Sequence, residues 1–329
     1  MKLKALFLQR ETQLALLTVL MIGVIGLRAP GFISSSSFDS MLTDSAILVM
    51  LVLAQMSVIV TRGIDLSVAS NLALTGMIVA SINAALPVLP VYALIGVALV
   101  IGLLLGALNG LLIGWLRLPP IVITLGTMSV FRGGIFLLSG GDWITSEMSP
   151  AFVSFPLARV MGLTHLVWFA VVAVCAWMIL MRYTRFGRDL YAIGSNPSAA
   201  QFAGVPVTRR LLLAYAISGM VAGFCGYLWV AKYAIAYTEI AYGFELTVVA
   251  GCVIGGISIA GGTGTVAGAV LGALFIGLIN NALPVIKVSP FWQGAVTGIA
   301  ILVAVIVNSR SSKVMEKHIL PASHSGVLA

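Results

Sequence analysis

Charge is scarce in this sequence. Lysine, arginine, aspartate and glutamate together make up 9% of the 329 residues, whereas about 25% is usual in soluble proteins. Hydrophobic residues make up 60%, and the mean hydropathy is +1.12. This composition excludes a soluble globular domain and indicates a membrane protein. The apolar runs are continuous, whereas the strands of a membrane barrel alternate over about ten residues, so the runs predict helices.

Several motifs of enzyme chemistry are missing. No stretch reads GxxxxGK[ST], so the chain lacks the phosphate-binding loop of a P-loop ATPase. HExxH is absent and no acidic residue lies deep inside an apolar run, which argues against a zinc hydrolase and against transport driven by an ion gradient. Cys175, Cys225 and Cys252 all fall within apolar runs and are interpreted as packing residues. We therefore predict no catalytic residue, no metal site and no disulfide framework.

The apolar runs set the expected architecture. A helix needs roughly 20 apolar residues to cross the hydrocarbon core of a bilayer. The sequence predicts an all-α, polytopic bundle of about ten spans, formed by residues 13–28, 46–60, 66–85, 91–114, 121–138, 165–181, 211–231, 245–260, 264–283 and 291–307. We expect residues 1–310 to form one transmembrane domain and residues 311–329 a polar tail.

The basic residues are distributed unevenly between these runs. With the N-terminus in the cytoplasm, thirteen of the eighteen basic residues fall in cytoplasmic segments and four fall outside, which is the bias expected of membrane proteins. Both termini are therefore predicted to be cytoplasmic. The net charge of +8 is explained by orientation, and we expect no nucleic-acid partner. Arg132 is the one cation within a run, and we expect a structural or gating role for it.

The largest cytoplasmic loop in this topology spans residues 182–210. Asn196 is suited to an N-cap, Pro197 to the first helical position and Gly204 to a left-handed C-terminal stop. These residues predict a helix of about two turns, with Ala199, Phe202 and Ala203 on one face. A helix this short is marginal in water, so it must pack on the membrane domain or on a second protein. A capped turn that only connects two spans is the alternative.

Four stretches resemble the permease subunits of bacterial ABC sugar importers of the ribose/xylose/rhamnose-type branch. They are "RGIDLSVAS" (62–70), "PPIVITLGTMSVFRGG" (119–134), "TRFGRDLYAIGSNPSAAQFAGVPV" and "GGISIAGGTGTVAGAVLGAL" (255–274). The resemblance implies the inner membrane, a second permease chain that is identical or a sibling, two cytoplasmic ATP-binding subunits and a periplasmic sugar-binding protein. The partner subunits would hold ATP and Mg, so no cofactor is expected in this chain. Ala69 and Thr61-Arg62 depart from the family's usual glycines.

In that family, the loop that matches residues 194–207 forms the coupling helix, which seats in a groove of the ATPase. The resemblance therefore implies a coupling role for one set of residues in the loop: Arg185, Gly187, Arg188, Gly194, Asn196, Pro197, Ala200 and Gly204. Other stretches, such as "NALPVIKVSPFWQ", look most like the rhamnose importers, with the autoinducer-2 importers next. The expected function is ATP-driven import of a monosaccharide by alternating access.

The two halves of the chain also resemble each other. "GIDLSVAS" (63–70) and "GFELTVVA" (243–250) share the order glycine, apolar, acid, leucine, hydroxyl, valine, and each opens an apolar run. In the predicted topology the two runs start from opposite sides of the membrane. This pattern predicts an inverted repeat of residues 46–138 and 226–307, with Asp65 and Glu245 as N-terminal caps.

A neutral sugar requires polar but uncharged groups along its route. Eight such residues lie in or beside spans, although each is more often an interhelical hydrogen-bonding residue: Gln55, Asn71, Thr75, Asn109, Thr124, Thr127, Asn280 and Asn281. Glycines repeat every fourth residue from Gly102 to Gly114, which predicts close helix packing. Two functional alternatives remain, namely a stand-alone facilitator or channel and an importer of another solute such as autoinducer-2.

Overall fold

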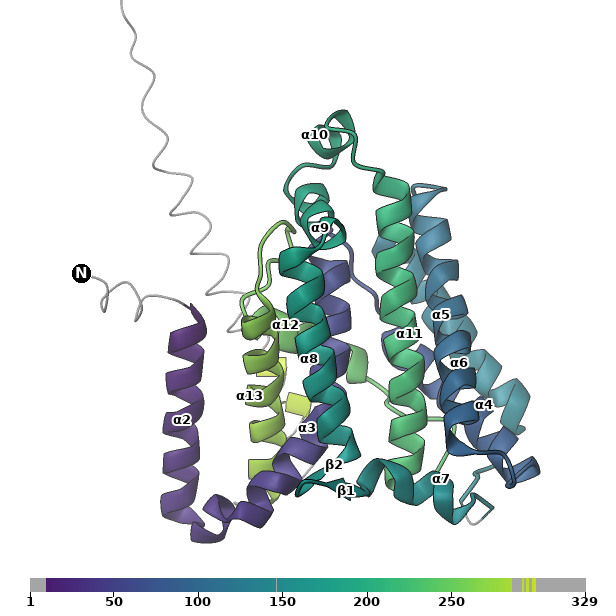
Figure 1. Cartoon of the computed structure of the whole chain (residues 1–329), viewed down its shortest axis with the longest axis vertical. Helices are drawn as coiled ribbons and strands as arrows, with labels where there is room; N and C mark the ends of the chain where they lie inside the picture. Colours follow the sequence, from purple (N-terminus) through teal and green to yellow (C-terminus); the bar gives the residue numbers. More distant parts are fainter. Residues whose placement is uncertain (1–9, 146, 286–291, 293, 296–297, 300–329) are drawn as a thin grey trace, which may run out of the picture.

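The computed structural model describes residues 10–145, 147–285, 292, 294–295 and 298–299, and this part of the chain is almost entirely helical (Figure 1). Eight of its helices are long and apolar enough to cross a membrane. They are α2 (Arg10–Arg28), α3 (Ser35–Ile59), α4 (Val68–Ala85), α5 (Val91–Gly114), α6 (Pro120–Ser139), α8 (His165–Tyr183), α11 (Val207–Tyr233) and α13 (Val266–Val285). The predicted all-α polytopic bundle is confirmed.

The expected span at residues 245–260 is wrong in its length. Helix α12 covers only Phe244–Ile254, which is 11 residues. The helix ends there because Gly256 adopts a φ of 84°, and Ile257 N–H then turns back to the carbonyl of Cys252 at 3.0 Å. The chain continues to α13 without helical structure. The expected span at 291–307 and the tail at 311–329 lie almost wholly outside the described residues.

Glycine contacts hold the centre of the bundle together. Helix α11 packs along α5 with Gly219 and Gly223 against Gly102 and Gly106, so that backbone meets backbone. The predicted close packing of the glycine repeat is therefore confirmed. Helix α3 lies beside this pair and is buried from Ala46 to Ile59. The apolar core thus forms where α3, α4, α5 and α11 meet.

The two ends of the bundle differ. One end carries α9 (Arg185–Ser195) and α10 (Pro197–Phe202), which lies farthest from the body in Figure 1. We call it the α10 end. The opposite end carries α7 (Pro150–Ser154), the strands β1 (Arg159–Val160) and β2 (Leu163–Thr164), and two short 3-10 helices, η1 (Pro30–Ile33) and η2 (Phe155–Leu157).

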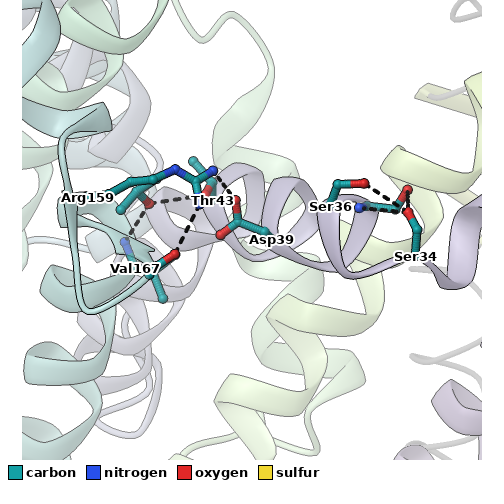
Figure 2. Close-up of polar contacts among 9 residues, drawn as sticks. Ser34, Ser36, Asp39, Thr43, Arg159 and Val167 are labelled. Atoms are coloured by element: carbon teal, nitrogen blue, oxygen red, sulfur yellow. Dashed lines mark hydrogen bonds and ion pairs between the residues drawn. The ribbon is translucent and has the colours of Figure 1, made fainter.

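Polar contacts fasten the start of α3 to the small hairpin at this opposite end (Figure 2). Arg159 of β1 forms an ion pair with Asp39, and Thr43 lies 3.1 Å from the hydroxyl of Thr164 in β2. Thr164 also caps α8 by accepting from Val167 N–H. The hairpin therefore contacts both α3 and α8, and it fixes the position of one helix relative to the other.

The two similar segments begin helices that run in opposite directions. Helix α4 follows Val60 at the α10 end, whereas α12 follows a segment in which Ala236 pairs with Ile144 of the α6–α7 connection. Helix α12 leads back to the α10 end, where Gly262 N–H donates to the carbonyl of Val60. Asp65 accepts from the N–H and hydroxyl of Ser67 just before α4, but the N-cap of α4 is Ser67 and that of α12 is Gly243, so the predicted N-cap positions of Asp65 and Glu245 are wrong. The inverted repeat itself stays a prediction, because its second unit extends beyond the described residues.

Candidate functional site

The predicted short helix is present as α10, with the expected residues at its ends. The Asn196 side chain accepts from Ala199 N–H at 3.0 Å, and Pro197 is the first helical residue. Gly204 follows the helix with a φ of 82°, and Val205 N–H donates to the carbonyl of Ala200. Local signals therefore set the two ends of this helix.

The apolar face of α10 points away from the protein. Ala199, Phe202 and Ala203 are exposed, and Phe202 is 93% exposed. Ala200 is the one buried residue of the helix. Within the described chain, the helix therefore does not cover its apolar face with the membrane domain. A large aromatic side chain so exposed beside a membrane domain is typical of a protein interface.

Helix α9 precedes α10 and was not predicted from the sequence, where residues 182–195 were interpreted as loop. Thr184 caps it by accepting from Gly187 N–H at 3.2 Å. Leu190 and Ile193 form its buried face, and an alanine Cβ at Gly187 would overlap the backbone of Met181. The signal was a threonine N-cap followed by apolar residues at helical spacing. Helix α9 thus seats α10 on the end of α8.

An ion pair joins α9 to the next spanning helix. Arg210 Nε of α11 lies 2.7 Å from Asp189 Oδ2, and the guanidinium also lies over the ring of Phe186. Both charged side chains are only about one-fifth exposed. The helix before α10 and the helix after it are therefore directly connected.

The structure brings the predicted coupling residues together on α9, α10 and the turn that follows. Three are buried and make close backbone contacts or pack inward, namely Gly187, Gly194 and Ala200. The other five are exposed: Arg185, Arg188, Asn196, Pro197 and Gly204. The exposed members are accessible to a partner, and the buried members hold α9 and α10 in place. Their role in coupling stays a prediction.

Most of the predicted pathway residues make hydrogen bonds between or within helices. Asn71 of α4 donates to the carbonyls of Gly102 and Gly219 at 3.2 and 3.4 Å, and it accepts from Thr75. Asn109 donates to Ser67 at 2.7 Å. These bonds fasten α4 to α5 and α11, which is the structural alternative weighed above.

The remaining predicted pathway residues either make similar hydrogen bonds or lie on α13, away from the others. Thr124 donates to the carbonyl of Ile64, and Thr127 donates to carbonyls of its own helix. Asn280 and Asn281 lie on α13, toward the end opposite α10. Asn281 donates to Gly277, whereas Asn280 Oδ1 is buried without a partner among the described residues. No contact among the described residues gathers the eight residues around one site.

Gln55 differs from the rest of the set. It lies on α3, its side chain is fully buried, and neither its amide oxygen nor its amide nitrogen has a partner among the described residues. A buried amide without a partner costs roughly 1–3 kcal/mol. Among the eight predicted pathway residues, only Gln55 has both of its amide atoms buried without a partner in the described chain, which makes it the strongest candidate of the set. Its role in the pathway stays a prediction.

Arg132 lies on α6 and holds the segment before α12. Its guanidinium donates to the carbonyl of Ile240 at 2.6 Å and to that of Ala241 at 3.2 Å, and it lies over the ring of Tyr242. Ala241 has a φ of 51°, a conformation that is unfavourable for alanine. Arg132 therefore has a structural role at this turn, and its predicted gating role stays open.

Metal-binding residues do not gather in the described part of the chain. No group of three or more histidine, cysteine, aspartate or glutamate side chains there could hold a metal ion. Cys225 and Cys252 are buried, and Cys175 is exposed on α8, without a disulfide among them. What the arrangement offers is a membrane bundle with a protruding helix at one end.

Comparison with known proteins gives a consistent assignment. A family described as "Branched-chain amino acid transport system / permease component" matches residues 37–305. The autoinducer 2 import system permease protein of Enterobacter sp. is 35% identical over 318 residues, which cover 96% of this chain and 91% of that protein.

Two further relatives are named for sugars. The galactose/methyl galactoside import permease protein of Escherichia coli is 34% identical, covering 91% of this chain and 94% of that protein. The ribose import permease protein of Escherichia coli is 33% identical, covering 93% and 95% respectively. No solved structure matches the chain. The chain therefore belongs to this family of membrane-spanning permease components, and it is a permease subunit of the bacterial ABC-importer type.

Proposed function

We propose that the chain imports a neutral monosaccharide by alternating access, with force delivered to α10 by a separate ATP-binding subunit in the cytoplasm. The observation that carries this proposal is the outward apolar face of α10, on which Phe202 is 93% exposed. The charge distribution supports a cytoplasmic location for this end and for both termini. ATP and Mg would be bound by the partner subunits.

The assembly proposed for import has two permease chains, two ATP-binding subunits and one periplasmic binding protein. Two copies of the permease would present two α10 helices to two ATP-binding subunits. Whether the second permease is identical or a sibling is tested by co-purification of a tagged chain with the products of the neighbouring genes. A tagged permease that purifies without any ATP-binding subunit would contradict the proposal.

We propose rhamnose or a related sugar as the solute, on the similarity of several stretches to the rhamnose importers. The relatives compared above are named for ribose, galactose and autoinducer 2, so these compounds are the competing solutes. The decisive measurement is uptake of radiolabelled rhamnose, ribose, galactose and autoinducer 2 by a deletion strain and by the complemented strain. If the deletion strain loses only rhamnose uptake, the proposal is supported. If it loses uptake of ribose, galactose or autoinducer 2 instead, that compound is the solute.

Replacing Phe202 with alanine should reduce solute transport about tenfold while the permease remains folded. The side chain is almost fully exposed, so its removal costs little folding free energy. A large apolar anchor in an interface is commonly worth 2 kcal/mol or more of binding, which is at least a roughly 30-fold change in affinity. The measurements are uptake, co-purification of the ATP-binding subunit, and the melting temperature in detergent.

The matched control is Val88→Ala. Val88 is 94% exposed, and it lies in the α4–α5 connection at the end opposite α10. The Val88→Ala variant should show the same uptake and the same co-purification of the ATP-binding subunit as the wild type. If Phe202→Ala transports normally, α10 does not receive the force.

The alternative function is tested with the purified wild-type chain in liposomes. If it passes sugar without ATP and without partner subunits, the chain is a facilitator and not part of an ATP-driven importer.

Replacing Gln55 with methionine should lower transport about tenfold without destabilising the protein. The two side chains are similar in volume, and methionine removes the buried amide that has no partner. The free energy of unfolding should therefore rise by about 1–2 kcal/mol. The sugar would lose a donor and an acceptor on its route. Thermal unfolding and uptake measured on the same variant separate these effects, and unchanged uptake would remove Gln55 from the pathway.

A further inference from the structure

Three segments that are distant in the sequence meet at backbone contact at the α10 end. They are the turn that follows α3 (60–62), the end of α9 (194–195) and the α12–α13 connection (261–262). Gly262 N–H donates to the carbonyl of Val60 at 2.9 Å. A Cβ on Gly194 would overlap the same carbonyl, so α9 ends directly on α3. We call this contact the three-segment junction.

Arg62 closes the three-segment junction with its side chain. Its Nε donates to the carbonyl of Gly194 and its Nη2 to that of Ser195, both at 2.7 Å. These carbonyls lie at the C-terminal end of α9, where the helix dipole favours a positive charge. The stem of Arg62 passes over Gly261, where a Cβ would overlap its Cγ or the nearby backbone. The absence of a side chain at Gly261 therefore leaves room for the stem of Arg62.

The backbone of Arg62 has an unfavourable conformation. Its φ is 68°, in the left-handed region that costs energy for any residue with a Cβ. Such a conformation persists only where the surroundings determine it. Here the surroundings are the two charge-assisted hydrogen bonds to α9. The unfavourable backbone conformation of Arg62 is therefore offset by its hydrogen bonds to Gly194 and Ser195, the residues just before α10.

We propose that Arg62 is a positioning residue that transmits movement of α10 to α3 and to the α12–α13 connection. Helix α10 begins at Pro197, two positions after Ser195, so a force on α10 acts first on the carbonyls that Arg62 holds. Tyr191 adds a second link, since its hydroxyl donates to Gly264 of the connection at 2.8 Å. This inference rests on the proposed function, in which α10 receives the force.

The same end of the bundle has a separate link toward α11. Arg210 of α11 pairs with Asp189 of α9, on the other side of the root of α10. A movement of α9 therefore reaches α11 through Arg210 and α3 through Arg62. Removing the Arg62 side chain weakens the route to α3, where the backbone contact of Gly194 with Val60 remains, and leaves the Arg210 route intact, so the two routes are separable by experiment.

The test follows hydrogen–deuterium exchange in the permease assembled with its ATP-binding subunits in nanodiscs. Exchange is compared without nucleotide and after trapping with MgATP and vanadate. In the wild type, trapping should change exchange in residues 185–206 and in residues 56–67. In Arg62→Gly, the change at 185–206 should persist, and the change at 56–67 should shrink about fivefold, at the low end of the effects seen for coupling between sites.

Glycine is the informative substitution because it removes both hydrogen bonds and also suits the left-handed backbone. The melting temperature of Arg62→Gly is therefore expected to stay close to that of the wild type. Arg62→Lys retains the charge and one hydrogen bond, so it should restore part of the change at 56–67. Met161→Gly is the matched control, since Met161 has a φ of 52° and is exposed at the opposite end. It should leave both exchange changes as in the wild type.

The outcomes distinguish this inference from the function on which it rests. A full exchange change at 56–67 in Arg62→Gly, with transport intact, overturns the role of Arg62 and leaves the role of α10 standing. A wild-type complex in which trapping leaves 185–206 unchanged contradicts the proposed function itself. If Arg62→Gly fails to fold, Arg62→Lys decides: an exchange change at 56–67 equal to that of the wild type, despite the lost hydrogen bond, overturns the inference.

Discussion

Replacing Gly219 with alanine is expected to leave almost no folded permease in the membrane. A Cβ at this position would overlap the carbonyl oxygen of Gly102 and the Cα of Gly106, and it would lie 2.7 Å from the nitrogen of Gly106. All three are backbone atoms of α5, so no side-chain rotation relieves the overlap. The helices must separate, and overpacking of this kind costs about 3 kcal/mol or more.

Separation of α5 from α11 would also break a polar contact. The amide of Asn71 donates to the carbonyls of Gly102 and Gly219, and it can reach both only while the two helices touch. The loss of these bonds adds to the cost of the overlap. One added methyl group therefore disturbs three spanning helices together.

The measurement for Gly219→Ala is the yield of monodisperse protein in detergent and its melting temperature. The matched control is Gly126→Ala, which also places a methyl group on an apolar spanning helix. A Cβ at Gly126 would meet nothing within 4 Å, and alanine is the better helix former by about 1 kcal/mol. The control should therefore express at least as well as the wild type. Equal yields of the two variants would show that α5 and α11 do not pack as described.

How far the sequence predicts this structure depends on how local the determining signal is. The caps of α10 are local, because Asn196, Pro197 and Gly204 each act on a neighbouring backbone group, and all three have the expected conformation. Helix α9 has an equally local threonine cap, but its buried face packs on the end of α8 and also on Val60, which is distant in the sequence. Because α9 lies within a long polar loop, its apolar face was not recognised in the sequence.

The length of α12 shows a limit of apolar runs. Residues 245–260 are almost continuously apolar, and hydropathy alone predicts a span. The helix nevertheless ends at Ile254, because the Gly255-Gly256 pair allows a left-handed stop and the next residues turn to meet Val60. The Gly255-Gly256 pair is a local signal that permits this stop, whereas the contact of Gly262 with Val60 is a tertiary one that hydropathy does not contain.

The pathway residues show a second limit. Neutral polar residues in apolar helices look alike in a sequence, whether they bind a solute or hold helices together. Only the three-dimensional contacts distinguish Asn71, whose amide is bonded to two helices, from Gln55, whose amide has no partner in the described chain. The outward direction of Phe202 is likewise visible only in the structure, because a helical face has no direction until its neighbours are placed.

Replacing Asp65 with asparagine is expected to stabilise the protein at neutral pH. Asp65 lies in the α3–α4 connection, outside both spanning helices, and is 1% exposed. Burial raises the pKa of its carboxyl group from 3.8 to about 6, although the hydroxyl and N–H of Ser67 oppose the rise. The folded state therefore binds this proton more tightly than the unfolded state. Its contribution to stability is complete below about pH 4 and is lost as the pH rises through 6.

The size of this effect follows from the same two values. The difference between 3.8 and about 6 corresponds to about 3 kcal/mol, which the ionised carboxylate costs at pH 7. Asparagine carries no charge, and its amide oxygen can still accept from Ser67. The free energy of unfolding of Asp65→Asn should therefore exceed that of the wild type by up to about 3 kcal/mol at pH 7. The two proteins should converge near pH 4.

The measurement is the melting temperature of both proteins in detergent at intervals from pH 4 to pH 8. Asp142→Asn, at an exposed position of the α6–α7 connection, serves as the control for removal of one negative charge. This variant shows what the loss of one exposed charge does to the melting temperature. A difference between Asp65→Asn and the wild type that stays constant from pH 4 to pH 8 would mean that Asp65 keeps its charge in water when the protein is folded. In that case Asp65 would not be buried in the α3–α4 connection as described.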